Sequence, residues 1–136
     1  MVKIDVTYTG SLSCTATHGP SKDSLTTDAP LDNQGLGRTF SPTDLLVTAL
    51  GSCIATLMGI YAERHALDIT GLTIGLEKHM QTDPRRIGRI PIEIHVPLTL
   101  DDRHRQGIET AAAHCPVKKS LHPDIDLTLS FTYPEK

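Results

Sequence analysis

An apolar segment that follows a strong helix-start signal constrains the fold of this chain most. Ser41 can cap a helix, Pro42 suits its first position, and Asp44 can complete the reciprocal hydrogen bonds of a capping box. The segment that follows, up to about position 65, is apolar on nearly every face, which predicts a helix buried on most of its sides. Small residues recur along it and would let another backbone approach closely, and a second subunit is one candidate for that backbone.

Segments that alternate apolar and polar residues flank this helix and predict strands. Strands are expected at about residues 2–8, 12–16, 72–76, 90–96 and 125–131, with a weaker signal between 21 and 31. A second helix is expected from Asp101 or Asp102 to about residue 114, where the pair Cys115-Pro116 interrupts it. Strands, a buried helix, strands, a helix and a last strand are typical of an α+β fold, not of a parallel nucleotide-binding sheet.

Length and charge narrow the classes of protein to which the chain can belong. A chain of 136 residues predicts a single domain over positions 1–136. Its formal net charge of -3 argues against a nucleic acid or a membrane surface as partner. The first residues alternate and lack the apolar run of a signal peptide, so we expect a cytoplasmic protein. In that compartment three cysteines are expected to be reduced, and an odd number argues against a disulfide framework.

Two of the three cysteines are candidates for redox chemistry. Cys53 lies in the middle of the apolar helix, where an isolated cysteine is usually a small, inert core residue. A thiol in such surroundings needs a nearby cation in order to ionise and act as a nucleophile. Cys115 lies at a helix break, where a thiol can reach a partner. The two suit an attacking and a resolving thiol, although both also suit simple packing, and Cys14 on a strand suits packing better.

Arg38, which precedes the capped helix, is the candidate for the missing cation, and a solvated loop charge is the alternative interpretation. The histidines and cysteines lack the spacing of metal ligands, so neither a metal nor another cofactor is expected.

Two segments resemble the cysteine motifs of the OsmC/Ohr family. They are SPTDLLVTALGSCIATLM at residues 41–58 and AAAHCPVKKSL at residues 111–121. The order of the expected elements is also similar to that family, so the resemblance spans nearly the whole chain. It implies an intertwined homodimer in which antiparallel sheets wrap the central, buried, Cys-bearing helices, with the active sites at the subunit interface.

The resemblance also implies an activity, that of a thiol-dependent peroxidase. Cys53 would reduce organic hydroperoxides, with hydrogen peroxide as a further candidate, and would become a sulfenic acid. Cys115 would then form a disulfide with Cys53, and an external thiol, such as a lipoyl group or another dithiol, would restore the pair. Family members use an Arg from the region before the Cys helix, and Arg38 is the only Arg before Cys53.

One position departs from the pattern of the hydroperoxidases in this family. Thr43 stands where they carry the Glu that pairs with the Arg, and Asp44 follows it. Asp44 is better placed to cap the helix than to hold Arg38, and this form of the motif resembles a less characterised branch of the family. The alternative function is therefore a non-catalytic dimer that binds a small apolar or thiol ligand near Cys53.

Overall fold

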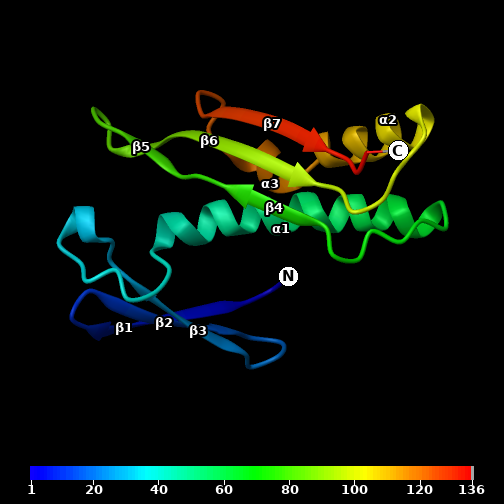
Figure 1. Cartoon of the computed structure of the whole chain (residues 1–136). Helices are drawn as coiled ribbons and strands as arrows, with labels where there is room; N and C mark the ends of the chain where they lie inside the picture. Colours follow the sequence, from blue (N-terminus) through cyan, green and yellow to red (C-terminus); the bar gives the residue numbers. More distant parts are fainter. Residues whose placement is uncertain (136) are drawn as a thin grey trace. The chain divides into compact units, whose positions relative to one another are not determined.

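A computed structural model describes residues 1–135, and these divide into two compact units, the first formed by residues 1–46 and the second beginning at residue 47. We describe each unit by itself. Figure 1 labels the elements of both units along the chain.

The first unit is built around an antiparallel sheet in the order β1-β2-β3. Its strands are β1 (Ile4–Gly10), β2 (Ser13–His18) and β3 (Ser24–Asp28), and a single turn of 3-10 helix, η1 (Leu31–Asn33), follows them. The strand expected only weakly between residues 21 and 31 is therefore present as β3. Val6 pairs with Ala16, and Ala16 pairs with Leu25, so these side chains form a row across one face. Val6 and Leu25 are 65% and 46% exposed, which leaves this apolar face uncovered in the single chain.

The second unit holds a four-stranded sheet arranged around its longest strand, β6. The strands are β4 (Thr73–Leu76), β5 (His79–Gln81), β6 (Arg86–His95) and β7 (Asp126–Thr132). Strands β4 and β5 both pair antiparallel with β6, and the alternating sequence predicts β4 and β6 as strands. Strand β7 pairs parallel with β6, because two helices carry the chain back along the sheet before β7 begins. The short strand β5 was not expected from the sequence.

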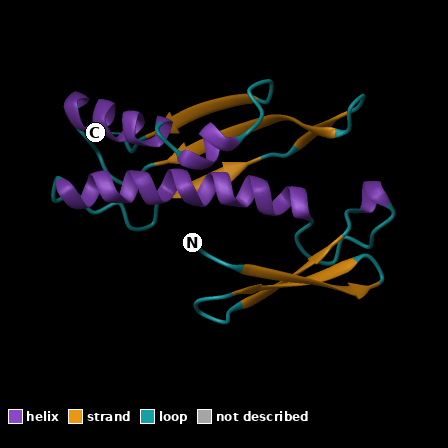
Figure 2. Cartoon of the chain, turned by 180° about the vertical axis from the view of Figure 1, so that it is seen from behind, coloured by secondary structure: helices purple, strands orange, loops and turns teal. Residues whose placement is uncertain are grey.

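Three helices lie against one face of this sheet, as the two opposite views show (Figures 1 and 2). They are α1 (Pro42–Arg64), α2 (Asp102–Ala113) and α3 (Pro116–Ser120). The core between sheet and helices is aliphatic, because alternate residues of β6 point into it. Its fully buried side chains include Leu50, Ile54, Met58, Ile90, Ile92, Ile94 and Ile108.

The start of α1 confirms the capping box expected from the sequence. The Ser41 backbone N–H donates to Asp44 Oδ2 over 2.9 Å, and the Asp44 backbone N–H donates to Ser41 Oγ over 3.1 Å. The helix then runs to Arg64, within one residue of its expected end.

Helix α1 buries one face within the chain, so the expectation of burial on most sides is met only in part. The buried residues are Val47, Leu50, Gly51, Ile54, Met58 and Ala62. At Gly51 the close neighbour is the Leu76 side chain, which an added Cβ would meet at 2.7 Å. Ile60 on another face stays 41% exposed. By length and composition alone α1 could cross a membrane, a test that the core helix of a soluble protein also passes.

Candidate active site

Cys53 lies in the middle of α1, at the border between its buried and exposed faces. Its side chain is partly buried and packs against the core of the second unit. Ile54, the next residue, points fully into that core, and Ser52, the residue before, is exposed. Successive residues of an α-helix are about 100° apart around its axis, which explains why the thiol lies between core and solvent.

Cys115 is placed by the break between α2 and α3. Because Pro116 disfavours the helical conformation for the residue before it, Cys115 is extended, with φ -65° and ψ 120°. The Cys115 side chain then caps α3, and its sulfur accepts a hydrogen bond from the Lys118 backbone N–H over 3.4 Å. The residue is 0% exposed and belongs to the hydrophobic core.

The fold brings the two cysteines together, although they lie far apart in the sequence. A hydrogen bond joins the side chains of Cys53 and Cys115, and both thiols are free. Burial raises the pKa of the Cys115 thiol, and the hydrogen bond to Cys53 raises it further. A hydrogen bond that raises a pKa favours the protonated form, so the contact with Cys53 favours the Cys115 thiol over its thiolate. The pair is therefore unequal, with a buried, protonated thiol beside a more accessible one.

Arg38 lies in the first unit, where it is held by Asp28 at the end of β3. The Arg38 Nε donates to Asp28 Oδ2 over 2.9 Å, and one terminal nitrogen donates to Oδ1 over 3.3 Å. The Arg38 backbone N–H also donates to Asp28 Oδ2, and the Ser13 hydroxyl donates to Oδ1. Asp28 is 1% exposed, whereas the Arg38 side chain is 56% exposed. The hydrogen bonds from Arg38 hold the pKa of the Asp28 carboxyl well below its usual range, so the pair stays ionised at neutral pH.

Sequence reasoning missed Asp28 as the partner of Arg38. It predicted that Asp44 caps α1, which the capping box confirms, and it left Arg38 without a carboxylate. Asp28 is the last residue of β3, just before the loop that carries the Arg, but the weak strand signal of this segment gave no clear pointer to it. Gly35 shows how tightly that loop is packed, because an added Cβ there would overlap the Ala29 carbonyl group.

Cys14 lies on β2, opposite Tyr8 and Thr27. It belongs to the first unit, whereas Cys53 and Cys115 belong to the second. It is partly buried, and its thiol is free. Within residues 1–135, no three His, Cys, Asp or Glu side chains group in a way that could hold a metal ion.

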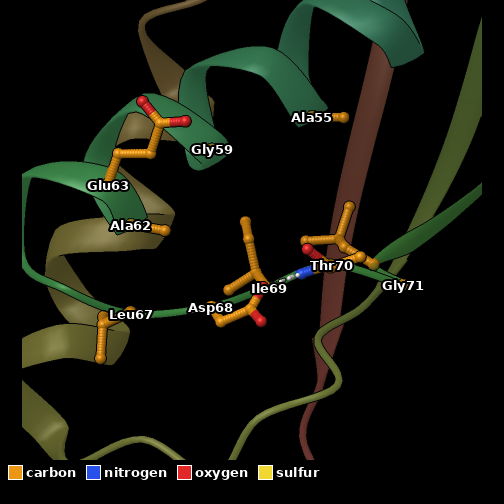
Figure 3. A pocket seen from close by; sticks show the side chains of 10 residues that line it. Ala55, Gly59, Ala62, Glu63, Leu67, Asp68, Ile69, Thr70 and Gly71 are labelled. Atoms are coloured by element: carbon orange, nitrogen blue, oxygen red, sulfur yellow. Dashed lines mark hydrogen bonds between the residues drawn. The ribbon is translucent and has the colours of Figure 1, made fainter.

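A cavity of about 310 Å³ lies beside α1, against the segment of residues 67–72 that follows the helix (Figure 3). Ala55 and Gly59 line it, and Gly59 has room for a side chain because an added Cβ would meet nothing within 4 Å. Ala55 follows Cys53 by two residues, which corresponds to about 200° around the helix. The cavity is therefore on the far side of α1 from Cys53 and is not the site of the thiol pair.

The fold and the site define a small α+β protein with a reduced, hydrogen-bonded dithiol at the edge of its core. The sequence model of the family described as OsmC-like protein matches residues 35–130. This chain belongs to the OsmC-like family. No protein of curated function matches it.

Solved structures similar to this chain share its fold along nearly its whole length. A Psychrobacter arcticus protein, provisionally described as an osmotic stress induced and detoxification response protein, is 44% identical, with a TM-score of 0.92. The alignment covers 97% of this chain and 96% of that one.

Two more distant structures show the fold alone. An organic hydroperoxide resistance protein from Legionella pneumophila is 14% identical, with a TM-score of 0.73 over 97% of this chain and 96% of its own. The organic hydroperoxide resistance protein OhrB of Bacillus subtilis is 18% identical, with a TM-score of 0.70 over 97% and 98%.

Proposed function

We propose that this protein is a cysteine-based peroxidase that reduces organic hydroperoxides. The observation that carries the proposal is the unequal pair, in which the side chain of a partly buried Cys53 meets that of a fully buried Cys115. A peroxidatic thiol must be reached by its substrate, and a resolving thiol must lie beside it without competing for that substrate. Cys53 and Cys115 meet these two requirements in that order.

The proposed reaction has three steps. The Cys53 thiolate attacks the distal oxygen of the hydroperoxide, the O–O bond breaks, and an alcohol leaves with Cys53 as the sulfenic acid. The Cys115 sulfur then attacks the Cys53 sulfur, and water leaves as the disulfide forms. An external thiol, for which a lipoyl group or another dithiol is the candidate, returns both cysteines to thiols and is itself oxidised.

The Asp28–Arg38 ion pair weakens the case for the non-catalytic alternative. That alternative, a dimer that binds a small apolar or thiol ligand, drew support from Thr43 in place of the family's Glu. Arg38 nevertheless has a carboxylate partner, because Asp28 binds it through two of its side-chain nitrogens. We propose Arg38 as the cation that assists Cys53, on the strength of the family resemblance and of this fixed guanidinium group.

One equivalent of cumene hydroperoxide is expected to convert two of the three thiols to a single Cys53–Cys115 disulfide. The two sulfurs already share a hydrogen bond, so the bridge needs little movement of the backbone. Free-thiol titration followed by peptide mapping measures the outcome, with Cys14→Ser as the matched control that should form the same bridge. An unchanged thiol count, or a dominant bridge to Cys14, would refute the peroxidase and leave the ligand-binding dimer.

We further propose that the chain works as a single domain in a homodimer, in the cytoplasm. The exposed apolar row on the first sheet supports the dimer, because a sheet of this size needs its apolar face covered. Three free thiols suit a reducing compartment.

Light scattering at micromolar concentration is expected to give twice the chain mass of 14.8 kDa. Val6→Glu should shift the protein towards monomer, because Val6 lies on the uncovered apolar row and a buried charge is costly. Thr7→Glu places the same charge on the opposite face of β1 and should leave the dimer intact. A wild-type monomer, or equal effects of the two substitutions, would contradict this arrangement.

A further inference from the structure

Helix α1 contacts the α2–α3 segment at the two cysteines and, further along, at an aromatic ring. There the ring of Tyr61 on α1 lies against the backbone of Gly107 on α2. A Cβ added at Gly107 would overlap the Tyr61 hydroxyl and ring atoms, so no larger residue fits there while the ring keeps its place. The close approach of the ring, and not an unusual backbone conformation, is what requires glycine at this position.

Two histidines hold the Tyr61 ring in this place. The His65 ring, one helical turn further along α1, stacks on the Tyr61 ring with the centroids 4.0 Å apart. The Tyr61 hydroxyl shares a hydrogen bond of 3.2 Å with His104 Nδ1 on α2. His65 is itself fixed, because its Nδ1 donates to the Tyr61 carbonyl oxygen over 2.8 Å. The ring therefore keeps α1 and α2 a fixed distance apart at this point.

The spacing along both segments connects this contact to the thiol pair. Tyr61 follows Cys53 by eight residues, and Gly107 precedes Cys115 by eight. Cys53 and Tyr61 both pack against the core of the second unit, so they lie on one side of α1, about 12 Å apart along its axis. Because Tyr61 meets Gly107 and Cys53 meets Cys115, α2 runs antiparallel to α1. The aromatic contact and the thiol pair are therefore the two ends of one contact between these segments.

We propose that the contact between Tyr61 and Gly107 positions Cys115 beside Cys53, because it sets the distance between α1 and α2. This inference rests on the proposed Cys53–Cys115 disulfide and makes Tyr61 and Gly107 positioning residues for it. A disulfide needs its two Cα atoms about 4.4–6.8 Å apart, so a small displacement of α2 is enough to disfavour the bond. Cys115 has little freedom to compensate, because it is buried and its sulfur caps α3.

Two substitutions that are each harmful should compensate when they are combined. Gly107→Ala puts a methyl group where the Tyr61 ring lies and should force the helices apart. Tyr61→Leu removes the ring and leaves a gap above Gly107, so α2 loses the contact that fixes its distance. The double variant places a leucine, which lacks the colliding ring atoms and hydroxyl, against an alanine and should restore the spacing. Gln106→Ala, at an exposed neighbour on α2, is the matched control.

The test measures the equilibrium between the reduced pair and the Cys53–Cys115 disulfide in mixtures of reduced and oxidised dithiothreitol, which requires no peroxidase activity. All proteins carry Cys14→Ser, and the bridged fraction is counted by mass after an acid quench and alkylation. We expect Gly107→Ala to lower the equilibrium constant for bridge formation at least about tenfold, and Tyr61→Leu at least about threefold. The double variant should return to within about threefold of the Cys14→Ser protein, and Gln106→Ala should match that protein.

An unchanged constant in Gly107→Ala would overturn the proposal, as would a double variant no better than Gly107→Ala. A role in stability alone would lower the melting temperature and leave the constant of the folded protein unchanged, which also counts against it. If Gly107→Ala does not fold, Tyr61→Leu decides, because a lower constant supports the positioning role and an unchanged one overturns it. Failure of the peroxidase proposal looks different, since wild type would then lose no thiols to cumene hydroperoxide yet still form the bridge with oxidised dithiothreitol.

Discussion

Replacing Cys53 with Ser is expected to lower hydroperoxide consumption to the rate of the uncatalysed reaction between hydroperoxide and reductant. A serine hydroxyl does not ionise near neutral pH and does not form the sulfur–oxygen intermediate on which turnover depends. The change removes one sulfur at a partly buried position, so the fold should tolerate it. The measurement is the consumption of cumene hydroperoxide in excess dithiothreitol, with Cys14→Ser as the control that should keep the wild-type rate.

Cys115→Ser separates the two proposed cysteine roles. This variant should still consume about one equivalent of hydroperoxide in the absence of reductant, because Cys53 remains able to attack. The product should be a Cys53 sulfenic acid that dimedone traps, whereas wild type should give a disulfide and little adduct. If Cys115→Ser failed in the first oxidation and Cys53→Ser did not, the roles of the two residues would be reversed.

Much of the fold was predictable from local sequence patterns, because those patterns report directly on burial. The box formed by Ser41 and Asp44 marked the start of α1, and alternating apolar residues marked the strand that became β6. Strand β5 spans only His79–Gln81, and its pairing with β6 comes from the neighbouring chain, not from an apolar period of its own. The parallel pairing of β7 likewise depends on the path of α2 and α3, which no local pattern encodes.

The candidate site was less predictable, because it depends on contacts between distant segments. Periodicity placed Cys53 on a helix and Cys115 at a helix break, which made them a possible thiol pair, and the family resemblance then favoured that pairing over simple packing. The hydrogen bond between them results from packing α1 against the α2–α3 break. The Asp28–Arg38 ion pair was missed because it depends on the folded shape of the loop between them, where Gly37 donates back to the Ala29 carbonyl.

Arg38→Ala is expected to slow the reaction of Cys53 with hydroperoxide by about tenfold or more at neutral pH. An opposite charge close to a thiol typically shifts its ionisation by about 1–3 pH units, and burial by itself opposes ionisation. Loss of the cation should move the pH midpoint of Cys53 alkylation upward, so the rate deficit should shrink as the pH rises above both midpoints. The assay uses protein with Cys14 and Cys115 replaced by Ser, and Arg89→Ala on β6 is the matched control.

Asp28 can affect Arg38 in two ways, by holding its guanidinium group in place or by neutralising its charge, and the substitution Asp28→Asn distinguishes them. If the ion pair holds Arg38 in a working position, Asp28→Asn should move the alkylation midpoint upward, by less than Arg38→Ala does. If Asp28 only neutralises Arg38, the same substitution should move the midpoint downward, because the cation gains effective charge. We expect the upward shift, since the buried Asp28 carboxylate accepts hydrogen bonds from both the backbone and the side chain of Arg38 and so fixes the two together.

Arg38→Lys should restore only part of the rate, because an ammonium group cannot reproduce the two-nitrogen contact with Asp28. Identical profiles for wild type and Arg38→Ala would remove Arg38 from the mechanism and make it a structural clamp of the loop.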